Sequence, residues 1–305
     1  MTDALPDLTG TRAIITGANS GIGYFTALEL TRRGAAVTLA CRNADKATEA
    51  ATKMTKTTPG AQVEVAELDL ASLQSVRTFA ASWDRPLDLL VNNAGVMYPL
   101  RRTETADGFE LQLGTNHLGH FALTGLLLPR LLAATAPRVV TVSSIAHKQG
   151  PQLNFDDLQM TFGYLAPLAY ANSKLANLLF ALELQRRSDA AGSALISAAA
   201  HPGLTATKLF SSPDGMGSNP VLRVAAGAVT KLVLQSPKGG SRPSLYAATA
   251  AAGGSYTGPS VLMESRGAPK PASMSAMAAD PVLAAQLWEA SQELTGVRYD
   301  WTSAH

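Results

Sequence analysis

The chain has 305 residues, of which 46% are hydrophobic and 16% charged, so a disordered or fibrous protein is excluded and a packed core is expected. The 25 basic and 23 acidic residues leave a formal net charge of +2, which is too balanced for the basic surface that binds nucleic acid. Cys41 is the only cysteine, so neither an internal disulfide nor a thiolate metal cage can form, and a reducing compartment fits.

Two segments bear on targeting and membrane insertion. Residues 1–11 contain two aspartates and a proline, so they lack the apolar core of a signal peptide. The most apolar stretch, 118–136, is interrupted by a histidine, a proline and an arginine, which indicates a buried helix and not a membrane span. We therefore expect a cytoplasmic protein without a membrane span.

Short apolar runs alternate with longer segments of helical pattern along most of the chain. The runs predict strands at 13–16, 36–40, 63–68, 87–91, 139–142 and 195–199. The longer segments predict helices at 22–33, 45–56, 73–83, 108–134 and 169–187. Because the apolar runs lack strict alternation with polar residues, the strands should be buried on both faces of a parallel sheet. This order of elements predicts an α/β fold of the doubly wound, Rossmann type.

The C-terminal third adds a seventh predicted strand at 260–264 and an amphipathic helix at 281–294. A segment rich in proline, glycine and serine, 211–220, is interpreted as a surface loop because the sheet pattern resumes after it. We expect one domain, 1–305, with a seven-stranded parallel sheet in the order 3-2-1-4-5-6-7, flanked by helices.

A glycine-rich segment follows the first predicted strand and opens the first helix. Glycines let the backbone turn tightly and approach a pyrophosphate, whose charge the helix N-terminus stabilises. A plain strand-to-helix turn is the alternative for this motif taken alone. The residues that we expect to contact a dinucleotide here are Gly17, Asn19, Ser20, Gly21, Ile22 and Gly23.

A second motif, Asn92-Asn93-Ala94-Gly95, closes the fourth predicted strand. It belongs at the carboxyl edge of the sheet, where a ligand of such a fold lies. Asn93, Ala94 and Gly95 are therefore further candidate contacts of the dinucleotide.

A third motif places Tyr170 and Lys174 four residues apart on a predicted helix, so their side chains share one face. A phenol with a pKa of about 10 exchanges protons poorly near neutral pH, and a neighbouring ammonium favours the phenolate. In isolation the pair could also be a packed tyrosine beside a solvated lysine. The two other motifs favour a catalytic pair.

Together the three motifs resemble the short-chain dehydrogenase/reductase family over nearly the whole chain. The resemblance implies an NAD(P)-dependent oxidoreductase that interconverts C=O and CH–OH groups by hydride transfer. In this reading Tyr170 is the acid/base, Lys174 supplies charge and holds the ribose, and Ser144 polarises the substrate oxygen. Asn116 would hold a water that links the lysine to solvent. Ser143 is interpreted as a strand-end turn residue.

The resemblance assigns further residues to the cofactor. Asp69 and Leu70 would meet the adenine, although a helix N-cap is the alternative role for Asp69. Pro202 and Gly203 would lie at the nicotinamide, with Thr205 and Thr207 as candidates for its carboxamide. No metal is required, because the five histidines have no ligand spacing.

The end of the second strand favours NADP(H) over NAD(H). An NAD enzyme would place an acid there to hold the ribose 2′-hydroxyl, but this chain has Cys41. The following residue, Arg42, can pair with a 2′-phosphate. Ser20 stands where some NADP-specific relatives carry a second basic residue, so one positive charge is expected.

The branch of the family is indicated by the 26 positions (170 − 144) between Ser144 and Tyr170, a longer interval than most members have. This insertion and the segments 40–43, 116–121 and 173–177 resemble retinol dehydrogenases and the WW-domain oxidoreductase. We expect a lipophilic carbonyl or alcohol substrate. Protochlorophyllide reductases share 116–121, so a C=C reductase stays an alternative, as do a non-catalytic NADP-binding sensor or partner protein and a structural subunit.

Two properties stay open from the sequence. The region 204–238 carries an apolar stripe at helical spacing, which predicts either a lid over the substrate or a helix packed on the sheet or on another subunit. Family members commonly associate through the helices predicted at 108–134 and 169–187. This implies a homodimer or homotetramer, unless the insertion or the final helix covers that face and leaves a monomer.

Overall fold

The computed structural model describes residues 5–99, 101–150, 153–205 and 235–304. The strands of these residues form one sheet in the order β3-β2-β1-β4-β5-β6-β7-β8. Their bounds are β1 Arg12–Thr16, β2 Ala36–Cys41, β3 Val63–Glu67, β4 Leu89–Asn92, β5 Arg138–Val142, β6 Ile196–Ala200, β7 Tyr256–Val261 and β8 Arg266–Pro271. The first seven strands are parallel, in the predicted order, and β8 is antiparallel to β7.

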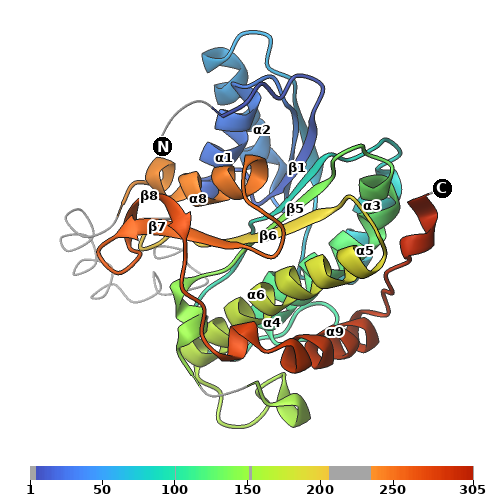
Figure 1. Ribbon diagram of the computed structural model, residues 1–305, viewed down its shortest axis with the longest axis vertical. Coiled ribbons are helices and arrows are strands. Elements are labelled where there is room, and N and C mark those ends of the chain that lie inside the picture. Colours follow the sequence, from blue (N-terminus) through green and yellow to red (C-terminus); the bar gives the residue numbers. More distant parts are fainter. Residues whose placement is uncertain (1–4, 100, 151–152, 206–234, 305) are drawn as a thin grey trace.

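Most of the parallel strands are buried as the apolar runs predicted, but the prediction is wrong for β3, which lies at the edge of the sheet and has no fully buried residue. β1, β5 and β6 each bury their last four residues, because helices cover both faces of the sheet. Figure 1 shows α1, α2 and α8 on one face and α3, α5 and α6 on the other. The bounds are α1 Gly21–Thr31, α2 Ala44–Thr57, α3 Leu73–Ser82, α5 Gly119–Leu132, α6 Ala166–Ala190 and α8 Pro237–Thr249. The short helices are α4 Leu111–Leu113, η1 Gly114–Leu118, η2 Ile145–Lys148, η3 Phe155–Asp157, η6 Met277–Ala279 and η7 Trp301–Ala304.

The helix predicted at 108–134 covers Leu111–Leu132 and is not α-helical throughout. It begins at α4, passes through one turn of π-helix at η1, and continues as α5. A π-helical turn widens the helix locally and often lies at a functional site. Here it contains Asn116, one of the candidate catalytic residues.

The last helix, α9 Pro281–Thr295, follows the prediction closely and packs on α6. Trp288 of α9 is 2% exposed, and its ring lies 5.1 Å from Phe121 of α5 and 4.4 Å from Tyr299 of the tail. The hydroxyl of Tyr299 donates to the carbonyl of Phe121 at 2.7 Å. The C-terminal segment therefore covers α5 and α6 on the side away from the sheet (Figure 1).

The edge of the sheet differs from the prediction. The strand predicted at 260–264 is displaced to β7, and an eighth strand follows that the sequence did not reveal. The chain reverses because Leu262, Met263 and Glu264 have φ values of 51°, 51° and 63°. β8 contains two prolines, which an edge strand tolerates because one side of it forms no ladder.

Helix α8 was also not predicted, because its two glycines and internal proline have low helix propensity. Pro237 at its first position and Ser236, whose side chain accepts from the Gly239 N–H, fix where it begins. The predicted lid at 204–238, its apolar stripe and Thr207 lie mostly or wholly in 206–234, outside the described residues.

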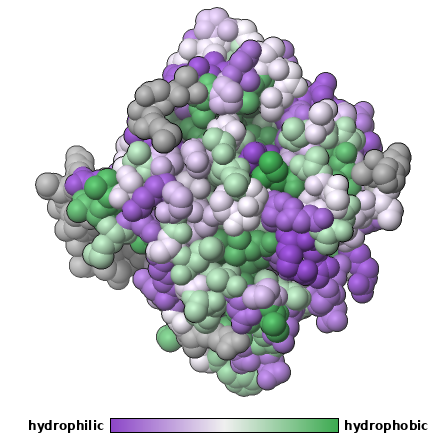
Figure 2. Space-filling model, in the orientation of Figure 1, coloured by the Kyte–Doolittle hydropathy of each residue, from purple (hydrophilic) through white to green (hydrophobic). Residues whose placement is uncertain are grey.

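Within the described part of the chain, helices that are both long and apolar enough to cross a membrane are not found. Hydrophilic and hydrophobic residues are interspersed in small groups on the face shown in Figure 2. Such mixing is usual for the surface of a globular protein.

Candidate active site

A cavity of about 450 Å³ opens at the carboxyl ends of the central strands. It contains most of the residues that the motifs predicted for the cofactor and the catalytic pair. They are Gly17, Asn19, Ser20, Gly21, Ile22, Gly23, Arg42, Asp69, Leu70, Asn93, Ala94, Gly95, Tyr170, Lys174 and Pro202. The sheet therefore brings the three motifs to one place, although Gly17 and Lys174 are 157 positions (174 − 17) apart in the sequence.

The glycine loop fits a pyrophosphate. Gly17 has φ +65°, and a Cβ there would lie 2.9 Å from the Cα of Ala94. A Cβ on Gly23 would lie 2.7 Å from the carbonyl oxygen of Gly17, so a side chain at either position would displace the loop. Ser20 is extended at the N-cap of α1 and makes no capping hydrogen bond within the described structure, so the helix N-terminus offers its first N–H groups to an anion.

The second motif is joined to the first through Thr16. Its hydroxyl accepts the backbone N–H groups of Asn93 and Ala94, each at 2.9 Å, and the Asn93 side chain donates to the Thr16 carbonyl at 2.8 Å. Nε2 of His120 lies 2.8 Å from the same hydroxyl. The loops after β1 and β4 thus form one hydrogen-bonded floor of the cavity.

Tyr170 and Lys174 are both buried on α6, at 8% and 4% exposure. The Nζ atom of Lys174 lies 5.7 Å from the centroid of the Tyr170 ring and donates to the carbonyl of Val142 at 3.2 Å. Burial lowers the pKa of Lys174 to about 8. Burial also raises the pKa of Tyr170 above its ordinary value, and a hydrogen bond with the Ser144 hydroxyl offsets only part of this rise.

The expectation that the lysine makes the phenolate favourable is therefore wrong for the chain by itself. Desolvation dominates at Tyr170, and the ammonium is held by the strand carbonyl at a distance from the ring. At neutral pH Tyr170 keeps its proton.

The two serines after β5 have different surroundings. Ser143 donates to the backbone carbonyl of Lys174 at 2.7 Å and so anchors α6 to the sheet. Ser144 is the N-cap of η2 and accepts from the Ala146 N–H at 3.2 Å. Ser143, and not Ser144, lines the cavity, so the choice of Ser144 for the substrate oxygen stays a prediction.

Asn116 is 0% exposed and does not line the cavity. Its Oδ1 accepts from the Val96 N–H at 2.8 Å, and its Nδ2 donates to the Val96 carbonyl at 3.0 Å and to Ser173 at 2.9 Å. Its backbone carbonyl lies 2.9 Å from Nδ1 of His120. Asn116 therefore clamps the loop after β4 against α6.

Two predicted cofactor residues lie beside the cavity and not in its lining. Thr205 donates to the carbonyl of Pro202 at 2.9 Å, so its hydroxyl is used locally. Gly203 has φ +68° and packs against the carbonyl of Ser265, which leaves no room for a Cβ.

Asp69 lines the cavity and accepts from the Ala71 N–H at 3.0 Å. Helix α3 is capped by Ser72, so the alternative N-cap role for Asp69 is not observed.

The sequence did not point to Lys46, which lies in the first turn of α2 and lines the cavity together with Arg42. Asn43 caps this helix by accepting the Lys46 N–H at 2.8 Å. The spacing of four between Arg42 and Lys46, with a capping asparagine between them, is the signal that could have identified it.

The sheet order, the glycine loop at its carboxyl edge and the buried Tyr170–Lys174 pair together define a nicotinamide-dependent oxidoreductase of the Rossmann type. The family model described as short chain dehydrogenase matches residues 11–214, and the chain belongs to this family. It is an oxidoreductase that acts on CH–OH and C=O groups.

Relatives of the chain include human retinol dehydrogenase 13, which is 41% identical over 294 residues, covering 95% of this chain and 86% of that protein. A crystal structure of an uncharacterised protein from Mycobacterium paratuberculosis has a TM-score of 0.80 and 45% identity, with 97% of each chain covered. A crystal structure of an NAD(P)-dependent gluconate 5-dehydrogenase from Beutenbergia cavernae, with bound NADP, has a TM-score of 0.60 and 26% identity, covering 80% of this chain and 91% of that one.

Proposed function

We propose that the protein interconverts a lipophilic carbonyl compound and its alcohol with NADP(H), using Tyr170 as the acid/base. The observation that carries this proposal is the position of the Tyr170 and Lys174 side chains in the same cavity as the glycine loop. Asn116, outside the cavity, supports the Tyr170–Lys174 pair by donating a hydrogen bond to Ser173 of the same helix α6.

Each side chain of the site has its own role in the reaction. The bound cofactor supplies or takes up a hydride. Tyr170, protonated at neutral pH, donates its proton to the substrate oxygen in the reducing direction, and Ser144 donates a hydrogen bond to the same oxygen. Lys174 is cationic below about pH 8 and stabilises the negative charge that develops on the phenol.

The preference for NADP(H) is supported by two cations at the end of β2. Arg42 and Lys46 are exposed and line the cavity where an NAD enzyme would have an acid. A 2′-phosphate would be paired by the Arg42 guanidinium and the Lys46 ammonium. The Beutenbergia cavernae structure, which holds bound NADP at low occupancy, is consistent with this proposal.

A lipophilic substrate is supported by the surroundings of the phenol. Met97, Tyr98 and Ala146 form an apolar cluster with Tyr170, and the Tyr98 ring packs edge-on against Tyr170 at 5.3 Å between centroids. An aldehyde or ketone that reaches the phenol would lie against these side chains. The names of the retinol dehydrogenase relatives agree with such a substrate class.

The test is NADPH oxidation with a panel of lipophilic aldehydes and ketones, including retinal, beside short polar carbonyls. Turnover should be highest with the lipophilic members. Turnover of protochlorophyllide in the light, without turnover of any carbonyl, would favour the C=C reductase. Tight NADPH binding without turnover of any substrate would favour the sensor.

A further inference from the structure

The tip of the β7–β8 hairpin has an unusual backbone. Leu262, Met263 and Glu264 are three successive residues with a Cβ in the left-handed region. Such residues persist there only where the surrounding structure holds them. Leu262 and Met263 contribute little packing, because they are 59% and 95% exposed. Glu264, by contrast, turns inward, and its side chain is 12% exposed.

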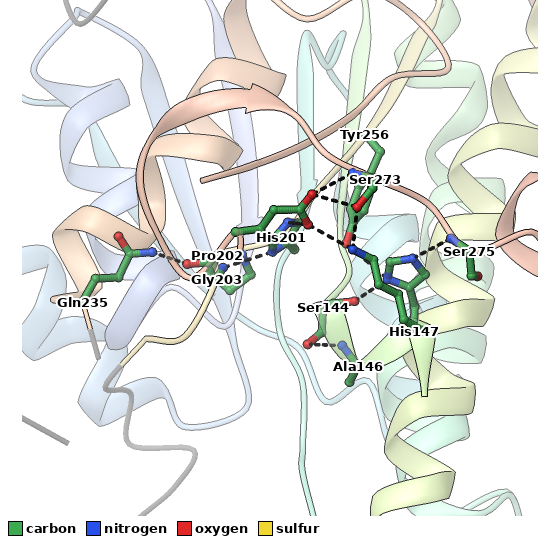
Figure 3. A network of polar contacts seen from close by, with 12 residues as sticks. Ser144, Ala146, His147, His201, Pro202, Gly203, Gln235, Tyr256, Ser273 and Ser275 are labelled. Atoms are coloured by element: carbon green, nitrogen blue, oxygen red, sulfur yellow. Dashed lines mark hydrogen bonds and ion pairs between the residues drawn. The ribbon is translucent and has the colours of Figure 1, made fainter. Parts of the chain in front are cut away.

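The contacts of Glu264 explain what holds the tip. Oε1 accepts from the backbone N–H and the hydroxyl of Ser273, each at 2.9 Å, and Oε2 accepts from Nζ of Lys148 at 3.2 Å (Figure 3). Nε2 of His201 lies 3.4 Å from the same Oε2. Burial alone would raise the pKa of this carboxyl, but the hydrogen bonds from Ser273 and Lys148 bring it down to about 2. Glu264 is therefore an anion at neutral pH.

On one side, the carboxylate reaches the segment after β6. Nδ1 of the buried His201 accepts the Gly203 N–H at 3.2 Å, so in the neutral imidazole Nε2 carries the proton. This Nε2 lies 3.4 Å from Oε2 of Glu264, in contact with it but without a well-aligned hydrogen bond. Burial lowers the pKa of His201 to about 4, which keeps it neutral. The backbones are also joined directly, because the Leu204 N–H donates to the Ser265 carbonyl at 3.0 Å. Pro202 lies between His201 and Leu204 in the sequence and lines the cavity.

On the other side, the carboxylate reaches the turn that carries Ser144. Lys148 is the last residue of η2, which begins directly after Ser144. Nζ of Lys148 also donates to the Ser273 hydroxyl at 2.7 Å, so lysine, serine and carboxylate form a closed set of contacts. The hairpin is thus joined to both flanks of the catalytic end of the cavity (Figure 3).

We infer that Glu264 is a positioning residue that holds the Pro202–Gly203 segment and the Ser144 turn at a fixed separation through His201 and Lys148. It touches neither substrate nor reacting atoms. The inference rests on the proposed function, in which the first segment lies at the nicotinamide and the second polarises the substrate oxygen.

The test compares Glu264→Gln with the wild type in the full-length protein. Glutamine keeps the size of the side chain but loses the charge that holds Lys148. We expect kcat for carbonyl reduction to fall about tenfold, because small displacements of reacting groups are costly. The Kd for NADPH should change less than twofold, because the glycine loop and Arg42 are untouched. The emission of bound NADPH should shift, because the surroundings of its nicotinamide change.

Two further variants separate positioning from general stability. Lys148→Met should reproduce the fall in kcat, and the double variant should be no worse than the single ones, since both remove the same contact. Glu293→Gln, which removes an exposed charge on α9, should leave kcat, emission and unfolding unchanged. A destabilised Glu264→Gln protein with normal kcat and normal emission would show that the residue only supports the hairpin, and would overturn the inference.

The emission readout distinguishes the inference from the function it rests on. Should the wild type bind NADPH without reducing any carbonyl, the proposed function fails, yet a shifted emission in Glu264→Gln and Lys148→Met still supports positioning. If the wild type is active and both variants match it in kcat and emission, the inference is wrong and the function stands.

Discussion

Nζ of Lys174 lies 5.7 Å from the ring centroid of Tyr170 and is held by the carbonyl of Val142, not by the phenol. Both groups are buried, and burial disfavours the charged form of each: it lowers the pKa of the amine and raises that of the phenol. The resting pair therefore holds a protonated phenol, which suits proton donation to a substrate oxygen. The developing charge on that phenol is what the nearby ammonium can stabilise.

Because Lys174 is buried, the stability of the folded protein should depend on pH. Its pKa is about 8 in the folded protein, whereas an unfolded lysine has a pKa of about 10.4. Between these values the unfolded state binds more protons, so the stability of the wild type relative to Lys174→Met should rise as the pH rises from 8 to 10.4. Urea unfolding of the cofactor-free proteins at several pH values measures this difference. Parallel stability curves for the two proteins would contradict it.

Arg42 and Lys46 should determine the choice of cofactor. Arg42→Ala and Lys46→Ala should each raise KM for NADPH about tenfold, because each removes a charge-assisted contact to the 2′-phosphate. KM for NADH should stay within twofold. Lys53→Ala, which removes an exposed charge further along α2, is the matched control. Equal losses with NADH and NADPH would assign the two cations to general binding.

The glycine loop should tolerate no side chain at Gly23. A Cβ there would lie 2.5 Å from Nδ2 of Asn93 and 2.7 Å from the Gly17 carbonyl, so the floor of the cavity must shift. Gly23→Ala should lower the affinity for NADPH at least tenfold, because the shifted loop loses its contacts with the pyrophosphate. Fluorescence titration with NADPH measures this. Unchanged affinity in a folded Gly23→Ala protein would place the pyrophosphate elsewhere.

The C-terminal segment should keep the protein monomeric. Helix α9, with Trp288, and Tyr299 after it cover the side of α5 and α6 that a partner subunit would need. Light scattering should give the mass of one chain. Trp288→Ala should cost about 3–5 kcal/mol of stability, as truncation of a buried tryptophan does, without a change in affinity for NADPH. A dimeric wild type would mean that another face associates.

Several features could be predicted from the sequence because local residues determine them. The glycine loop, the Tyr170–Lys174 spacing and the alternation of strands and helices each lie in one short segment, and all three recur in the structure as expected. The choice of Ser144 over Ser143 stays a prediction, because Ser143 is the serine that lines the cavity.

The remaining features depend on tertiary contacts. The reversal at Leu262–Glu264 uses left-handed residues that are not glycine, so no turn signal marks it, and β8 contains prolines that disfavour strands. The pKa of Tyr170 depends on burial, which the spacing to Lys174 does not reveal. The role of Glu264 depends on contacts with Lys148 and His201, which are distant in sequence.

The central claim is that Tyr170 transfers the proton in carbonyl reduction, and the most direct measurement compares wild type with Tyr170→Phe. Phenylalanine keeps the ring and its packing against Tyr98 but removes the hydroxyl. With a lipophilic aldehyde that the wild type reduces, kcat should fall about 10²- to 10⁴-fold, while the Kd for NADPH stays within twofold. Undiminished reduction by Tyr170→Phe would contradict the claim.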